Sequence, residues 1–221
     1  MFVTVILERL SGAFLLNCEL FALTLLFALP LGLVVAFGSM SRCKPLSGAV
    51  KTFVWVIRGT PLMLQIIVIY LGPGLLGMNN PWPSGSGGRM VAAVVAFAIN
   101  YACYFSEIYR GGIESISAGQ YEAAQVLGYT GGQTFGRILL PQMIRRVLPP
   151  VTNEVITLVK DTSLASVIGT VEMFTRAKQI VASPNTPGML ALAAAGLFYY
   201  VFNYIVAFAM ERAERSLAYY Q

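Results

Sequence analysis

The polar side chains with the clearest chemical potential lie within one otherwise apolar stretch, residues 147–169. On a helix with 100° per residue, five of them fall within an arc of about 120°: Asn153, Glu154, Thr157, Lys160 and Asp161. Thr162 and Ser163 follow outside that arc. Ionisable side chains at membrane depth are costly and usually mark a functional path. We therefore treat these seven residues as a candidate substrate path.

Two other interpretations of this stretch stay open. Lys160 and Asp161 could mark a helix break or the outer edge of the membrane, where they would form a structural pair. Lys160 and Ser163 could also form a Ser–Lys nucleophile of an intramembrane enzyme, although no second motif supports that reading.

The residue inventory excludes several other kinds of chemistry. The chain has no histidine, and Asp161 is its single aspartate, so triads with histidine and aspartyl dyads cannot form within it. Its three cysteines are far apart and lack metal-ligand spacing, so we expect no metal site. A GxxxxGK[ST] loop for nucleotide phosphates is also missing, so any energy source must be a partner.

Composition indicates a membrane protein. Of 221 residues, 57% are hydrophobic and 11% are charged, whereas soluble domains have about 25% charged residues. Because a spanning helix needs about 20 apolar residues, we expect an all-α membrane protein with five transmembrane helices. The expected spans lie near residues 15–37, 61–77, 90–106, 147–169 and 189–210.

Lysine and arginine counts predict the orientation, because cytoplasmic loops are enriched in them. With five spans, nine basic residues fall on one side: Arg42, Lys44, Lys51, Arg110, Arg137, Arg145, Arg146, Arg212 and Arg215. Four fall on the other: Arg9, Arg89, Arg176 and Lys178. This asymmetry predicts an external N-terminus and a cytoplasmic C-terminus, and it does not suggest a nucleic-acid partner.

The long connection at about 111–145 would then be cytoplasmic. Residues 120–127 are good helix formers, and Gly128 is expected to end that helix. A second short amphipathic stretch follows and is expected to break at Pro141. A helix of two turns is not stable alone in water, so it must dock on something. Ala123 and Ala124 permit close approach, and Glu122 offers one fixed negative charge.

The spacing of this connection resembles the EAA loop of ABC importer membrane subunits, EAA-x3-G-x9-I-x-L-P. Three further stretches resemble the polar amino acid permeases of that family: RGTPLMLQ at 58–65, SEIYRGGIESI at 106–116, and LPPVTNEVITLVKDTSLASVIG at 148–169. The resemblance covers residues 14–212 and implies one transmembrane domain, 1–221, of the type I importer fold. It implies that the ATPase-coupling residues are Tyr121, Glu122, Ala123, Ala124, Leu127, Gly128, Ile138, Leu140 and Pro141.

The resemblance also implies the partners. They are a dimer of ATPase subunits, a second identical or related membrane subunit, and an extracytoplasmic amino-acid-binding protein, in a bacterial cytoplasmic membrane. ATP and Mg²⁺ would bind the ATPase, so the chain itself needs no cofactor and is not an enzyme. The substrate would be a polar amino acid, whose zwitterion suits a path with both charge signs. A passive channel or secondary carrier is the alternative, although carriers commonly show internal repeats.

Four further charged residues have roles that the sequence leaves open. Arg58 is either a cation that sets topology at the membrane surface or a gate or interface residue. Glu107 is a second gate or interface candidate, although three-residue spacing favours an ion pair with Arg110. Glu19 is expected near the outer boundary of the first span.

Overall fold

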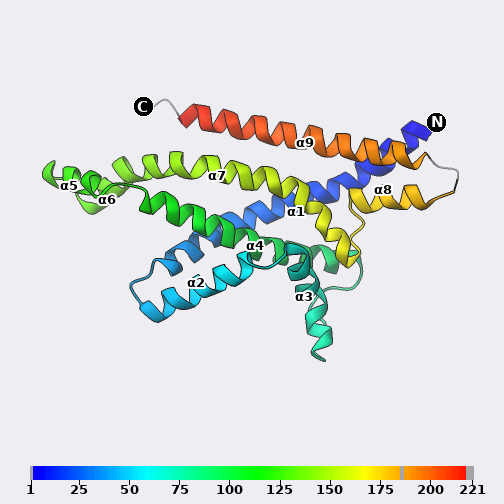
Figure 1. Cartoon of the computed structure of the whole chain (residues 1–221), viewed down its shortest axis with the longest axis horizontal. Helices are drawn as coiled ribbons and strands as arrows, with labels where there is room; N and C mark the ends of the chain where they lie inside the picture. Colours follow the sequence, from blue (N-terminus) through cyan, green and yellow to red (C-terminus); the bar gives the residue numbers. More distant parts are fainter. Residues whose placement is uncertain (1, 185–186, 218–221) are drawn as a thin grey trace.

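The computed structural model describes residues 2–184 and 187–217, and every regular element among them is helical. The long helices are α1 (Phe2–Ser39), α4 (Ser86–Glu114), α7 (Leu140–Asp161) and α9 (Gly188–Leu217). They run along the long axis of the molecule (Figure 1). The start of α1 and the end of α9 lie at opposite ends of this axis (Figure 1).

Three helices in the described residues are long and apolar enough to cross a membrane: α1, α4 and α9. They contain the expected spans 15–37, 90–106 and 189–210. A fourth span results if α2 (Lys44–Arg58) and α3 (Leu62–Leu75) count together, although they are bent by 106°. The expectation of five spans is not confirmed, because α7 is not among these helices.

The bend between α2 and α3 corrects the expected straight span at 61–77. A helix already begins at Lys44, and Pro61 is the N-cap of α3. Gln65 compensates for the break: its Nε2 donates to the carbonyl oxygens of Ile57 (2.7 Å) and Thr60 (3.2 Å). Asn100 of α4 donates to Gln65 Oε1 at 3.0 Å, so the bend is fixed to the central helix.

Between α4 and α7 the chain forms α5 (Ala118–Val126), α6 (Gly131–Thr134) and a π-helical turn, Phe135–Leu139. The expected break at Pro141 is wrong. Pro141 lies in the first turn of α7, where an N–H is not needed for the helical ladder and the missing donor costs little. The helix continues through Pro149 and Pro150 to Asp161.

The α-helix does not continue to the end of the expected span 147–169 but stops at Asp161. Residues Thr162–Ile168 form a 3₁₀ helix, η2, which ends at Gly169 in the left-handed region with φ of 77°. Helix α8 (Met173–Ala182) follows and packs between α1 and α9 through buried residues such as Leu10, Met173 and Ala191. This small core closes the end of the molecule opposite α5 (Figure 1).

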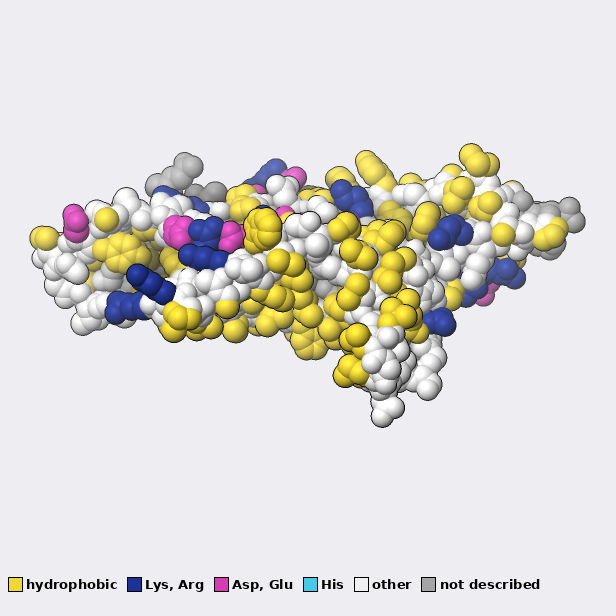
Figure 2. Space-filling model, turned by 60° about the horizontal axis from the view of Figure 1, so that its bottom comes forward, with side chains coloured by type: hydrophobic (Ala, Val, Ile, Leu, Met, Phe, Trp, Pro, Cys, Tyr) yellow, Lys and Arg dark blue, Asp and Glu magenta, His cyan; other side chains and the backbone are white. Residues whose placement is uncertain are grey.

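The main core lies where α4 packs against α1 and α7. Phe97, Tyr101 and Phe105 of α4 are almost fully buried there. Outside this core, large apolar side chains such as Leu26 and Val34 of α1 are exposed. Figure 2 shows hydrophobic side chains over much of the middle of one face, with a group of acidic and basic side chains towards its left end. Such a surface suits contact with lipid or with another membrane subunit.

Close packing of α1 on α4 depends on Gly32. A Cβ atom at this position would lie 2.8 Å from Cβ of Phe105 and 3.0 Å from the carbonyl oxygen of Ala102. The two backbones can therefore approach only because Gly32 has no side chain.

We predict that Gly32→Ala lowers the free energy of unfolding by about 1–3 kcal/mol, because the helices must separate to admit the methyl group. Gly12→Ala in the same helix is the matched control. No atom lies within 4 Å of its added Cβ, so helix propensity should make it neutral or stabilising. Thermal unfolding of both variants in detergent measures the difference, and equal stabilities would contradict the packing argument.

Candidate functional site

Helix α5 is short and exposed, and its end is well defined. The N–H of Gly128 donates to the carbonyl of Gln125 (2.9 Å), and the N–H of Tyr129 donates to that of Ala124 (3.0 Å). This pair of bonds is a Schellman motif. Gly128 has φ of 74°, which explains why glycine occupies the position. The expectation that Gly128 ends the helix is confirmed.

The surface of α5 that faces away from the protein is partly apolar. Ala124 is buried against the rest of the chain, whereas Tyr121, Glu122 and Ala123 are exposed. Val126 and Leu127 are 87% and 72% exposed. Because residues four apart share a face, Glu122 and Val126 lie together, opposite Ala124. We call Tyr121, Glu122, Ala123, Val126 and Leu127 the α5 surface.

The rest of the loop motif lies beside α5, which contacts the π-helical turn. Ile138 lies half-buried in the π-helical turn, and exposed Leu140 and Pro141 begin α7. Gln142 donates through Nε2 to Oε1 of Gln120 at 3.3 Å, which links α7 to α5. Motif residues that are distant in sequence are therefore brought to one end of the molecule.

The polar stripe of α7 is largely accessible. Asn153, Thr157 and Lys160 are exposed, whereas Glu154 and Asp161 are half-buried. The other side of the helix carries the core residues Val151, Val155, Leu158 and Val159. A polar face of this kind on a helix within a membrane bundle must meet protein or water, because lipid cannot solvate it.

The end of the stripe is organised by Asp161, whose Oδ2 accepts a hydrogen bond of 2.8 Å from the Tyr101 hydroxyl of α4. Lys160 forms none of the ion pairs among the described residues, so the expected Lys160–Asp161 pair has no contact to support it. The α-helix does end at Asp161, however, as the alternative of a helix break there expects. Ser163 is half-buried and donates to the carbonyl of Lys160. Thr162 is 1% exposed and turns towards α1, so the structure separates it from the stripe.

Arg58 and Glu107 meet, as the α2–α3 bend brings the end of α2 beside α4. Arg58 Nη1 lies 3.8 Å from Glu107 Oε2, and its guanidinium lies 5.0 Å from the centre of the Tyr104 ring. Glu107 also accepts bonds of 3.1 and 2.6 Å from Arg110, so the expected ion pair is present. Arg110 extends the network to Glu114 at 2.7 Å.

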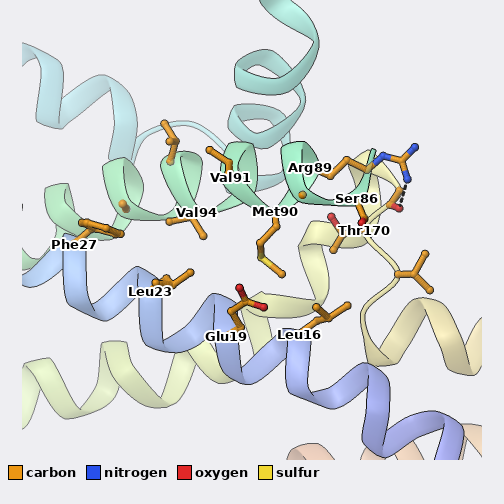
Figure 3. Close-up of a pocket in the computed structure, with 15 residues that line it drawn as sticks. Leu16, Glu19, Leu23, Phe27, Ser86, Arg89, Met90, Val91, Val94 and Thr170 are labelled. Atoms are coloured by element: carbon orange, nitrogen blue, oxygen red, sulfur yellow. Dashed lines mark hydrogen bonds between the residues drawn. The ribbon is translucent and has the colours of Figure 1, made fainter. Parts of the chain in front are cut away.

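A cavity of about 740 Å³ lies between α1 and α4 (Figure 3). Glu19 points into it from α1, and Leu23, Phe27 and Val94 line its apolar walls (Figure 3). Arg89, near the start of α4, donates to the carbonyl of Gly169 at 2.9 Å. No residue of the α7 stripe lines this cavity. The cavity is therefore separate from the candidate path.

Sequence reasoning missed a second polar site, which consists of Asn17, Thr162, Glu172 and Tyr199. These residues are joined by hydrogen bonds between buried or partly buried side chains. Asn17 was the available signal, because an amide within an expected apolar span needs a partner. Glu172 gave no such signal, since it lies outside every expected span.

Comparison with known proteins places the chain in a family. Residues 28–219 match the family described as "Binding-protein-dependent transport system inner membrane component". The chain is 36% identical to the L-cystine transport system permease protein TcyB of Bacillus subtilis, over 94% of this chain and 86% of TcyB. It is also 36% identical to the arginine transport system permease protein ArtQ of the same organism, over 96% and 92% of the two chains.

Solved structures agree with this fold. A structure described as an amino acid ABC transporter with histidines has 29% identity and a TM-score of 0.85, and the match covers 98% of both chains. The MetNI methionine ABC transporter has a TM-score of 0.65 over 98% of this chain and 96% of that chain. Its identity of 18% supports a shared fold only. The fold is therefore that of a type I importer transmembrane domain.

We predict that Gly128→Ala loosens the end of α5, because a left-handed conformation costs a residue with a side chain about 1–2 kcal/mol. The amides of Leu127 and Tyr129 should then exchange hydrogen about 5–30 times faster, as measured by hydrogen–deuterium exchange. Gly119→Ala in the same helix is the control, since nothing lies within 4 Å of its added Cβ. Unchanged exchange in Gly128→Ala would contradict the motif.

Proposed function

This chain belongs to the family of binding-protein-dependent transport system inner membrane components, the multi-pass permease subunits of bacterial ABC importers, and we propose that it imports a polar amino acid. The observation that most directly supports this proposal is the match over nearly the whole chain to amino-acid permeases. Those relatives are described as cystine and arginine systems. We therefore propose polar amino acids as the substrate class and do not single out one of them.

The α5 surface is the proposed binding site of the ATPase. A helix of nine residues is too short to be stable by itself in water, yet here it ends in a complete Schellman motif and exposes Val126 and Leu127. Exposed apolar side chains around one fixed charge, Glu122, are suited to insertion into a cleft of a partner. Movement of that partner during ATP hydrolysis would be passed to α7 through the Gln120–Gln142 contact.

The polar stripe of α7 is the proposed substrate path. Asn153, Thr157 and Lys160 present an amide, a hydroxyl and an ammonium on one accessible face. Glu154 and Asp161 add carboxylates beside it, so both ends of a zwitterion find a complementary group. Thr162 and Ser163 stand beyond this face, and we do not assign them to substrate contact.

The same face supports a second membrane subunit as partner. Because lipid cannot cover exposed polar groups, another subunit must complete the walls of the path. Arg58 and Glu107 lie at an interface between helices, so a gate role there remains part of the proposal. The excess of basic residues on the α5 side supports a cytoplasmic C-terminus and an external N-terminus.

An extracytoplasmic binding protein would then approach the end that holds α8, opposite α5 (Figure 1). The permease itself would carry out no catalysis and need no cofactor, since ATP and Mg²⁺ would bind the ATPase. A passive channel or secondary carrier would not need the α5 surface. Copurification with an ATPase subunit distinguishes these alternatives, as does concentrative uptake by liposomes that contain this chain alone.

We predict that Gly128→Asp and Glu122→Arg each reduce ATP-driven amino acid uptake by about tenfold or more, the effect of one lost docking contact of about 1.4 kcal/mol. Both variants should still insert in the membrane. Uptake into proteoliposomes that hold the complete transporter provides the measurement, and Gly12→Ala is the control. Normal uptake by Gly128→Asp would refute the coupling role.

We predict that the double variant Asn153→Ala/Glu154→Ala weakens substrate recognition in the path about tenfold, which corresponds to about 1.4 kcal/mol. The apparent KM of uptake should rise while the ATPase activity of the complex persists. Glu211→Ala, at an exposed site near the end of α9, is the matched control for loss of a carboxylate. A wild-type KM in the double variant would count against the path.

A further inference from the structure

A buried polar cluster connects four helical elements at the end of the molecule opposite α5. Asn17 comes from α1, Thr162 from η2, Tyr199 from α9, and Glu172 directly precedes α8. Asn17, Thr162 and Glu172 are each 1% exposed. We call these four residues the α8 latch.

Glu172 fixes the start of α8. Its carboxylate accepts hydrogen bonds of 2.7 Å from each of the backbone N–H groups of Phe174 and Thr175, so it caps the helix. It also accepts from the Tyr199 hydroxyl and from Asn17 Nδ2, both at 3.3 Å. Among the described residues, Glu172 takes part in no ion pair. The buried carboxyl group is therefore held by oriented donors, and its position depends on all of them.

Asn17 links the start of α8 to the end of α7. Its Oδ1 accepts from the Met173 N–H at 3.0 Å, while its Nδ2 donates to Thr162 Oγ1 at 3.0 Å and to the Tyr199 hydroxyl at 2.9 Å. Thr162 in turn donates to the carbonyl of Val159 in α7. One amide thus contacts both segments, and moving either one alone would leave buried polar groups unpaired.

The latch adjoins the proposed path. Thr162 directly follows Asp161, which closes the polar stripe of α7 through its hydrogen bond with Tyr101. A continuous series of contacts therefore runs from α8 through Asn17 and Thr162 to Asp161. Along its length α8 also presents exposed side chains, among them Phe174 (39%) at its start and Val181 (46%) near its end, together with Lys178 and Gln179.

We infer that the α8 latch makes the geometry of the path depend on the position of α8, so that a binding protein docked on α8 acts on Asp161 through Asn17, Thr162 and Glu172. Asn17 and Glu172 are positioning residues in this scheme, because they contact the path only through Thr162. The inference rests on the proposed function, since it requires an extracytoplasmic partner at this end of the molecule.

The test uses the complete transporter of membrane subunits, ATPase and binding protein in lipid nanodiscs. The quantity measured is the ratio of ATP hydrolysis with ligand-loaded binding protein to hydrolysis without it. Tyr199→Phe and Thr162→Val each remove one hydroxyl from the latch and nearly preserve side-chain volume. Tyr204→Phe removes the same group from a site on α9 that is 63% exposed and serves as the control.

We expect Tyr199→Phe and Thr162→Val to lower the stimulation ratio about fivefold or more, with unstimulated hydrolysis and assembly unchanged, and Tyr204→Phe to keep the wild-type ratio. A wild-type ratio in both latch variants would overturn the inference. An equal loss of stimulated and unstimulated rates would also overturn it, because the cluster would then be structural only. If the wild-type complex itself shows no stimulation, the proposed function fails and not the latch alone.

Discussion

Hydrocarbon offers no hydrogen-bond partner, so every break in a membrane helix must be repaired by the protein itself. This chain breaks its helices at two such places. At the α2–α3 bend, Gln65 supplies donors for carbonyl oxygens that Pro61 cannot serve, and Asn100 holds Gln65. Between η2 and α8, Glu172 supplies acceptors for free N–H groups, and Asn17 joins both sides. Each repair uses a side chain from α1 or α4, so these two helices form the frame that fixes the irregular segments.

The apolar core and the proposed functional surfaces lie on different parts of the molecule. The α1–α4 core is apolar and tightly packed, whereas the polar stripe of α7 and the α8 latch meet at η2, and the α5 surface lies in the connection between α4 and α7. Buried polar side chains within the bundle, such as Gln65 and Glu172, form hydrogen bonds with free backbone groups or with other polar side chains. Exposed apolar side chains, such as Val126 and Leu127, lie where we propose that a partner binds. Buried polar and exposed apolar side chains therefore mark the surfaces for which we propose a function.

Sequence alone predicted the helical class, three of the spans, the end of α5 at Gly128 and the pairing of Glu107 with Arg110. These depend on local signals: apolar length, a glycine that can adopt positive φ, and spacing on one helix face. The bend at Gly59–Pro61 and the continuation of α7 through Pro141 were not predicted, because a proline can cap, begin or break a helix, and tertiary contacts choose between these. The latch joins residues more than 140 positions apart, so no window of sequence contains it. Which residues contact substrate depends on a neighbouring subunit, and a single chain does not specify that.

The close approach at Gly32 also limits how this protein can move. Two helices whose backbones interlock around a missing side chain cannot slide or roll on each other without first separating, so α1 and α4 behave as one rigid body. Under the proposed transport role, we expect any reorientation of the subunit to come from rotation about the joints that flank this body: the turn at Gly59–Pro61, the π-helical turn before α7 and the 3₁₀ segment after it. Two of these joints lie next to proposed functional surfaces: the π-helical turn lies beside the α5 surface, and the 3₁₀ segment connects the polar stripe of α7 to the α8 latch.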